Sequence, residues 1–129
     1  MNKNTITTRK GIYGIHNKVN NKWYIGSTVQ DRGVQIRWYQ HKWSLGKGTH
    51  VNKRLQADWK SYGENAFEIK LLFELPGDAD YFSNRKSIAF IEWCYVKNYS
   101  ADDPAHGYNR TEGGLYGKYT KENNSRGKY

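Results

Sequence analysis

The sequence predicts an α+β domain in which a small three-stranded antiparallel sheet is flanked by helices, in the order β-β-α-α-β-α. A length of 129 residues suits a single domain. Two short runs rich in Ile, Tyr and Trp lie near the N-terminus on either side of an Asn-rich turn. Further along, apolar residues recur first at helical spacing and then at alternate positions. Elements that follow one another in such blocks are typical of the α+β class.

The first two strands, at residues 11–16 and 22–27, are expected to form a hairpin. The connection at residues 17–21 is rich in Asn, which tolerates the left-handed backbone of tight turns. If the loop has an even number of residues, Tyr13 and Tyr24 project from one face, because side chains alternate along a strand. The opposite, core-facing side then holds Ile12, Trp23 and Ile25. An odd loop would separate the two tyrosines.

Two helices are expected after the hairpin. The first covers residues 32–45, with Asp31 as its N-cap and Gly46-Lys47-Gly48 as its end. Its inward residues are Val34, Trp38 and Leu45. The second lies between Thr49, a candidate cap, and Gly63, a natural C-terminal stop. Its helical apolar stripe consists of Val51, Leu55, Trp59 and Tyr62.

A third strand and a third helix complete the predicted domain. The strand is indicated by the alternating apolar residues Phe67, Ile69, Leu71 and Phe73. Pro76-Gly77 ends it, the helix follows at about residues 80–98, and residues 102–107 form a loop. The single cysteine, Cys94, has no disulfide partner and no Cys or His cluster around it for zinc. We expect it to be a small core residue.

The charge balance indicates a polyanionic partner. Lys and Arg total 21 against 12 Asp and Glu, which gives a net charge of +9 and a pI near 9.6. Such a balance favours nucleic acid over a membrane as the partner. No stretch is apolar enough to span a bilayer, and the polar N-terminus lacks the apolar core of a signal peptide. An intracellular protein is therefore expected.

Arg37 and His41 lie four residues apart, on one face of the first predicted helix. Together they could bind phosphate, since Arg presents a rigid two-pronged set of donors. The alternative is an ordinary solvated helix face.

Glu92 lies inside the apolar stripe of the third predicted helix, among Ile88, Ile91, Tyr95 and Tyr99. A carboxylate in such a place must be paired, protonated or bound to a metal, because an unpaired buried charge is costly. Mg²⁺ sites that act on phosphates often use one or two carboxylates with substrate oxygens and waters. The alternative is a structural ion pair with one of the many basic residues.

Gly11-Ile12-Tyr13 followed by Tyr24-Ile25-Gly26 resembles the two-part signature for which the GIY-YIG nuclease superfamily is named. Arg37-Trp38 with His41 resembles the catalytic-helix motif of that family. The resemblance covers about residues 10–114.

Three later segments extend the resemblance. His50 with Lys53, Leu55 and Gln56 resembles the next helix of the phage intron-encoded homing endonucleases of the family. Glu92 with Tyr95-Val96-Lys97 resembles the segment that carries the family's metal-binding glutamate. Gly107-Tyr108-Asn109 resembles its closing motif.

The resemblance implies a metal-dependent DNA endonuclease, with one Mg²⁺ or Mn²⁺ per active site and no small-molecule cofactor. Glu92 would hold the metal, Tyr13 would act as general base, and Arg37 would stabilise charge on the phosphorus. Tyr24 would orient the water or phosphate, His41 would support Tyr13 or the leaving phosphate, and Asn109 would brace the metal side. The residues expected to grip the DNA backbone are His50, Lys53, Arg54, Lys118 and Lys121.

The expected domain organisation is a polar extension at residues 1–9, a nuclease domain at residues 10–114 and a basic flexible tail or linker start at residues 115–129. Homing enzymes of the family usually continue into a separate DNA-binding region, so the chain is either a stand-alone nuclease or a catalytic fragment. A monomer is compatible with the sequence, which leaves the oligomeric state open. The alternatives for function are a nuclease that prefers single-stranded or branched DNA, and a nucleic-acid binding module without catalysis.

Overall fold

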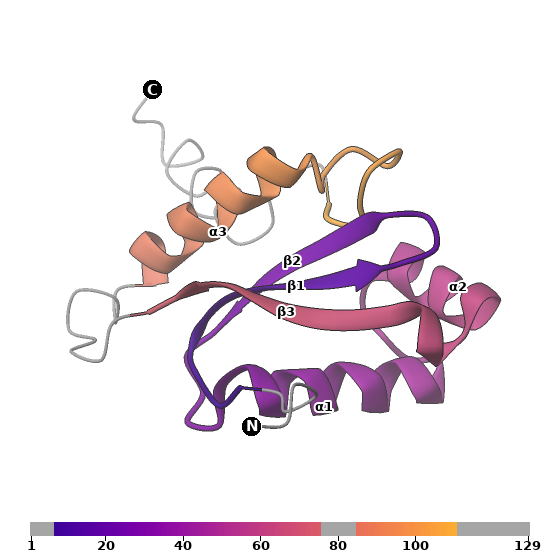
Figure 1. Ribbon diagram of the computed structural model, residues 1–129, viewed down its shortest axis with the longest axis horizontal. Helices are drawn as coiled ribbons and strands as arrows, with labels where there is room; N and C mark the ends of the chain where they lie inside the picture. The colour runs from indigo at the N-terminus through magenta and orange to yellow at the C-terminus, as the bar shows by residue number, and fades with distance from the viewer. Residues whose placement is uncertain (1–6, 76–84, 111–129) are drawn as a thin grey trace, which may run out of the picture.

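The computed structural model describes residues 7–75 and 85–110. Its elements are β1 (Gly11–Asn17), β2 (Lys22–Thr28), α1 (Gly33–Lys47), α2 (Lys53–Tyr62), the 3₁₀ turn η1 (Glu64–Ala66), β3 (Phe67–Glu74) and α3 (Arg85–Tyr99). The three strands form one antiparallel sheet in the order β2-β1-β3. Figure 1 shows α3 on one face of this sheet and α1 and α2 on the other. The predicted α+β class and element order are confirmed.

The hairpin has a four-residue loop between β1 and β2, so the condition for pairing the two tyrosines is met. Tyr13 lies opposite Gly26, and Ile15 lies opposite Tyr24. Residues directly opposite in an antiparallel pair point to the same side. Tyr13, Ile15 and Tyr24 therefore share the face toward α1 and α2, as predicted.

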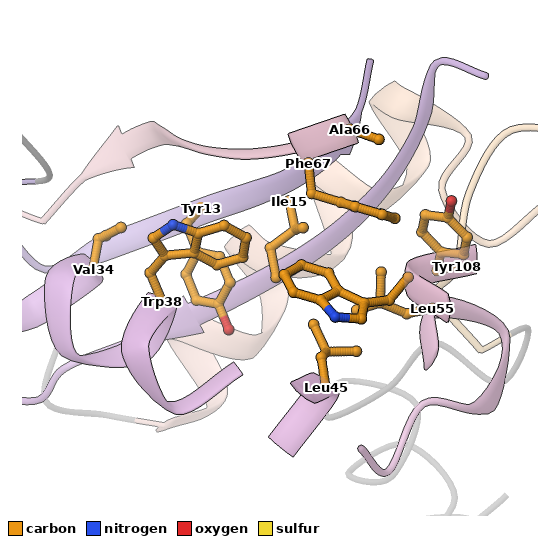
Figure 2. Packing of buried hydrophobic residues seen from close by; sticks show 10 residues of the cluster. Tyr13, Ile15, Val34, Trp38, Leu45, Leu55, Ala66, Phe67 and Tyr108 are labelled. Carbon is orange, nitrogen blue, oxygen red and sulfur yellow. The ribbon is translucent and has the colours of Figure 1, made fainter. Parts of the chain in front are cut away.

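Both faces of the sheet are buried, because each is covered by helices. The larger cluster joins the sheet to α1 and α2 and includes Tyr13, Ile15, Val34, Trp38, Leu45, Leu55, Trp59, Ala66, Phe67 and Tyr108 (Figure 2). The second cluster lies toward α3 and includes Ile12, Ile25, Val96 and Ala101, with Trp23, Leu72, Phe73, Ile91, Tyr95 and Tyr99 packed against it. The ring of Tyr13 is thus part of the core, and its hydroxyl is the group that could take part in a reaction.

The third strand departs from strict alternation. The pairing of β1 with β3 shifts between Ile12 and Tyr13, which lie opposite Phe73 and Leu71. This irregularity inserts one residue in β3 and moves Phe73 to the α3 face. The prediction that Phe73 shares a face with Phe67, Ile69 and Leu71 is therefore wrong.

The start of α1 differs from the prediction. Asp31 does not cap the helix; it is exposed and lies 3.6 Å from the ammonium of Lys10. The free amides of Val34 and Gln35 instead donate to the carbonyls of Arg9 and Thr7. Residues 7–9, which were expected to lie outside the domain, thus close the first turn of α1. The helix ends at Gly48, whose left-handed backbone (φ 76°) suits glycine.

The start of α2 also differs from the prediction. Its N-cap is Asn52, whose side chain accepts from the Leu55 amide, so Thr49 is not the cap. Val51 lies before the helix and is exposed, and Tyr62 is exposed in the last turn. Leu55 and Trp59 are buried as predicted.

Helix α3 is described from Arg85, so the predicted start at residues 80–84 and the Pro76-Gly77 stop lie outside the described residues. Cys94 is exposed rather than buried, because it lies on the helix face turned from the sheet. Within the described part of the chain, no helix is long and apolar enough to cross a membrane.

The segment after α3 runs along the free edge of β2. Gly107 forms a parallel bridge with Trp23, the Trp23 amide donates to the His106 carbonyl, and the Tyr108 amide donates to the Trp23 carbonyl. The edge strand is therefore covered rather than open to solvent.

Candidate active site

Tyr13 lies across the hairpin partner Gly26. A Cβ atom at position 26 would lie 2.4 Å from the Tyr13 hydroxyl oxygen, too close for any side chain. The glycine of the second tripeptide therefore makes room for the tyrosine of the first. The two halves of the signature are therefore in direct contact in this fold.

Two side chains from one face of α1 converge on the oxygen of Tyr13, which lies on β1. The oxygen lies 2.7 Å from Nε2 of His41, and Nη2 of Arg37 donates to it at 3.4 Å. Arg37 Nη2 also lies 3.1 Å from His41 Nε2. The one-turn spacing of Arg37 and His41 on α1 aims both at the same atom, as the i, i+4 spacing indicated.

The electrostatics of this group are set by burial. Burial raises the pKa of the Tyr13 phenol well above its usual range; Tyr24 and Glu92 add to the rise, while Arg37 opposes it through its charge and its hydrogen bond. Burial and the positive charge of Arg37, with His50, lower the pKa of His41 to about 3. His41 is therefore neutral over the whole neutral range.

A second histidine, His50, contacts His41. His50 is buried, and its Nε2 lies 2.8 Å from Nδ1 of His41 with the two rings stacked. The His50 Nδ1 accepts from the backbone amide of Asn52 at 3.0 Å. The His50 amide donates to the Gln56 side chain, which in turn donates to the Leu45 carbonyl and ties the segment to α1.

Tyr24 lies beside both histidines, with its ring edge-on to His41 and His50. Burial and the charge of Glu92 raise the pKa of Tyr24 to about 12, and Arg37 opposes the rise. Among the described residues, its hydroxyl has no hydrogen-bond partner, which leaves it available to a water or a phosphate oxygen.

Glu92 approaches the site from α3, on the other side of β2. It is partly buried, and one carboxylate oxygen accepts from the Ser27 hydroxyl at 2.7 Å. Burial raises the pKa of this carboxyl, and the Ser27 hydrogen bond opposes the rise. No salt bridge to Glu92 occurs among the described residues, so the alternative of a structural ion pair lacks support there.

Asn109 acts on the backbone of β2. Its side-chain oxygen accepts from the Ile25 amide at 2.8 Å and its side-chain nitrogen donates to the Ile25 carbonyl at 2.9 Å. The side-chain amide of Asn109 thus makes the two hydrogen bonds that a neighbouring strand would make with Ile25, the residue between Tyr24 and Gly26. Its predicted place on the metal side has no support in these contacts, since both amide atoms are used on Ile25.

The residues predicted to grip DNA separate into three groups. His50 is buried with both ring nitrogens engaged, so neither is available for a phosphate. Arg54 donates to the carbonyls of Gly107 and Asn109 and so secures the segment along β2. Lys53 is exposed and keeps its ammonium in solvent. Lys118 and Lys121 lie outside the described residues.

Two supporting residues were not identified from the sequence. Gln40 accepts from Nη1 of Arg37 at 2.7 Å and so helps to aim the guanidinium. Its position three residues after Arg37 on the helix is the signal that could have indicated it. Ser27 orients Glu92, and only its place directly after the Tyr24-Ile25-Gly26 tripeptide marked it.

This small α+β fold is that of an endonuclease catalytic domain. It brings a neutral histidine and an arginine of α1 to a buried tyrosine of β1, with a carboxylate of α3 across β2. The family model described as the GIY-YIG catalytic domain matches residues 9–109. The chain belongs to the GIY-YIG endonuclease family.

Individual relatives agree with this assignment. The chain is 37% identical over 100 residues to intron-associated endonuclease 1 of Enterobacteria phage T4, a match that covers 77% of this chain and 39% of that protein. The chain thus spans about two-fifths of the length of this curated relative. Among solved structures, it is similar to the catalytic domain of the homing endonuclease I-TevI, with 30% identity, a TM-score of 0.66 and coverage of 79% of this chain and 98% of that one. A variant of the same catalytic domain matches with 32% identity, a TM-score of 0.65 and coverage of 78% and 92%.

Proposed function

We propose that this chain hydrolyses DNA phosphodiester bonds with the help of one divalent cation, Mg²⁺ or Mn²⁺, held by Glu92. The observation that carries the proposal is the convergence of His41 and Arg37 on the Tyr13 oxygen, with the carboxylate of Glu92 across the edge strand. The named relatives are an intron-associated and a homing endonuclease, which supports DNA as the substrate.

The residues fit a metal whose ligands come mainly from water and substrate. Among the described residues, no group of three or more His, Cys, Asp or Glu side chains could hold an ion by itself. Mg²⁺ that acts on phosphate is commonly bound through one or two carboxylates and keeps several waters. Glu92 supplies one such carboxylate, and its raised pKa shows a charge that burial makes unfavourable and that a cation would stabilise. The cation would supply positive charge that offsets the charge of the phosphate and of the leaving 3′ oxygen.

We assign each side chain a role that its position supports. Tyr13, as a phenolate, takes a proton from the attacking water, whose oxygen forms a bond to phosphorus as the bond to the 3′ oxygen breaks. Arg37 donates to the negative charge that develops on the phosphorus oxygens. Tyr24 orients the water or a phosphate oxygen through its hydroxyl, which has no hydrogen-bond partner within residues 7–75 and 85–110. His41 supports Tyr13 through their shared hydrogen bond.

The test is cleavage of duplex, single-stranded and branched DNA with Mg²⁺, with Mn²⁺ and with excess chelator. We expect cutting with either ion and none with chelator. Which DNA is cut fastest would decide between the duplex substrate and the single-stranded or branched alternative. Binding without cutting under every metal condition would instead favour a non-catalytic binding module.

A further inference from the structure

Three hydrogen bonds in a row connect the start of α2 to the Tyr13 oxygen. The row runs from the Asn52 amide to His50 Nδ1, from His50 Nε2 to His41 Nδ1, and from His41 Nε2 to the Tyr13 hydroxyl, at 3.0, 2.8 and 2.7 Å. A neutral imidazole carries one proton, so one nitrogen donates and the other accepts. Fixing the first donor therefore fixes every later one.

We propose that His50 is a positioning residue that holds His41 as its Nε2–H tautomer, so that His41 donates to the Tyr13 oxygen and does not accept a proton from it. This inference rests on the proposed function only in assigning the Tyr13 oxygen a part in catalysis.

The backbone amide of Asn52 can only donate a hydrogen bond. Its partner, His50 Nδ1, must therefore be unprotonated. The single proton of a neutral His50 is then on Nε2, and it points to Nδ1 of His41. His41 Nδ1 is consequently an acceptor, and the proton of His41 is on Nε2, toward Tyr13.

The opposite assignment requires an unfavourable state. If His41 carried its proton on Nδ1, His50 Nε2 would have to accept while His50 Nδ1 accepts from Asn52. His50 would then have no proton on either nitrogen, an imidazolate. Double protonation is disfavoured as well, because burial and the charge of Arg37 lower the pKa of both histidines, that of His41 to about 3.

The contact between Arg37 and His41 is the competing observation. Arg37 Nη2 lies 3.1 Å from His41 Nε2 and would donate to it if that nitrogen were unprotonated. Arg37 has other acceptors, however, in Gln40 and in the Tyr13 oxygen, and it is only part-buried. The Asn52 amide, in contrast, has no second acceptor among the described residues and would lose its partner, which is costly for a part-buried amide. We therefore assign both Arg37 and His41 as donors that converge on Tyr13.

The consequence concerns the base. A phenolate at Tyr13 accepts from His41 and Arg37 together, and both bonds strengthen as negative charge forms on the oxygen. The histidine pair cannot pass the Tyr13 proton toward Asn52, because the backbone amide at the end of the row accepts nothing. The proton of Tyr13 must therefore leave by a route other than the histidine pair.

The experiment is long-range proton–nitrogen NMR of the ¹⁵N-labelled chain at neutral pH, which distinguishes the two imidazole tautomers. The sequence has only 4 histidines, so single His→Gln variants assign them all. We expect His41 and His50 both as Nε2–H tautomers. Finding His41 in the parent chain as the Nδ1–H form, or doubly protonated, would overturn the proposal without any variant.

Two matched pairs of variants test the cause. His50→Gln keeps an N–H near the ring Nε2 position and should leave His41 as Nε2–H, whereas His50→Ala should let the Nδ1–H form of His41 appear. Asn52→Pro removes the amide hydrogen and the side-chain cap, and Asn52→Ala removes only the cap, so only the proline variant should change the His50 tautomer. Unchanged tautomers in both His50→Ala and Asn52→Pro would refute the fixing role.

Cleavage adds a separate readout. We expect His50→Ala to cut roughly 10- to 100-fold more slowly, comparable to removing the partner that orients a ligating histidine, with recovery in His50→Gln. His106→Ala, an exposed site, is the matched control. If the parent chain cuts no DNA, the proposed function fails, while the tautomer assignment is still decided by the spectra alone.

Discussion

The two sides of the edge strand β2 are built differently. On the α1 and α2 side, the Tyr13 oxygen and both nitrogens of His41 and of His50 all have hydrogen-bond partners, and these three residues are buried. On the α3 side, Glu92 has a single hydrogen bond within the described part of the chain, from Ser27, and is only partly buried.

The α1 and α2 side is therefore preorganised, whereas the α3 side is open to ligands from outside the fold. The donors that would stabilise a phenolate are held before substrate arrives, so little free energy is needed to orient them during reaction. The carboxylate keeps most of its coordinating capacity for partners from outside the fold, as a cation with waters and a phosphate requires. If so, substitutions on the α3 side should remove metal-dependent cleavage, and substitutions on the α1 and α2 side should remove proton transfer.

The largest effect is expected on the open side. Glu92→Gln keeps the size of the side chain and the acceptor for Ser27 but removes the charge that would hold a cation. We expect cleavage to fall to background while DNA binding persists, measured by single-turnover cleavage and by fluorescence anisotropy. Glu64→Gln, at an exposed position in η1, is the control and should cut like the parent. Full activity of Glu92→Gln would exclude metal binding through this residue.

On the preorganised side, Tyr13→Phe deletes only the hydroxyl and leaves the ring in the core. Proton transfer by a positioned group is typically worth about 10²- to 10⁴-fold, and we expect cleavage to fall by that factor. Tyr24→Phe should cost less, because an orienting hydroxyl transfers no proton. Circular dichroism checks folding, and a folded Tyr13→Phe that cuts at the parent rate would make His41 the leading candidate base. That result would also contradict the assignment of His41 as a donor through Nε2.

The pH profile discriminates between the two candidate bases. The pKa of Tyr13 is raised by burial, so the phenolate is the minor form at neutral pH and the rate should rise with pH, by about tenfold per unit while that holds. His41, with a pKa of about 3, is already unprotonated there and would give a flat profile. Single-turnover rates from pH 6 to 9 at saturating metal decide, and a flat profile would contradict the Tyr13 assignment.

Preorganisation should also affect stability below neutral pH. The pKa of His41 falls from 6.5 in the unfolded chain to about 3 in the fold. Between these two pH values the unfolded state therefore binds a proton that the folded state does not bind. The free energy of unfolding should therefore decrease as pH falls below about 6.5, by up to about 1.4 kcal/mol per unit for one such group. Urea unfolding between pH 7.5 and 5.5 measures the slope, which should be reduced in His41→Gln. An equal slope in that variant would assign the effect to other groups.

The smallest effects are expected in the first turn of α2, where Lys53 should contribute to DNA binding and Arg54 to the stability of the fold. Lys53 is exposed, so Lys53→Ala should weaken DNA binding and lower its salt slope by about 0.9 if it neutralises one phosphate, with an unchanged melting temperature. Arg54→Ala should instead lower the melting temperature, because it removes the donors to Gly107 and Asn109. The opposite pattern would exchange the two roles.

The sequence by itself determined the elements and which candidate side chains share a face, because these depend on local periodicity. Alternation along the strands placed Tyr13 and Tyr24 on one face once the loop was even, one-turn spacing paired Arg37 with His41, and the apolar stripe of α3 marked Glu92. Each of these inferences concerns residues within one or two adjacent elements, where backbone geometry fixes the direction of a side chain.

Only the tertiary structure decided what the remaining polar residues do. His50, Arg54 and Asn109 have the composition of a phosphate-binding or metal-binding set, yet each makes its hydrogen bonds to the protein itself. Two of them have partners that are distant in sequence: 84 residues separate Asn109 from Ile25, and 53 separate Arg54 from Gly107. The start of α1 at the carbonyls of Thr7 and Arg9, and the move of Phe73 to the α3 face, have the same origin. A buried donor or acceptor must be satisfied by whatever the fold brings near it, and that neighbour has no signature in the local sequence.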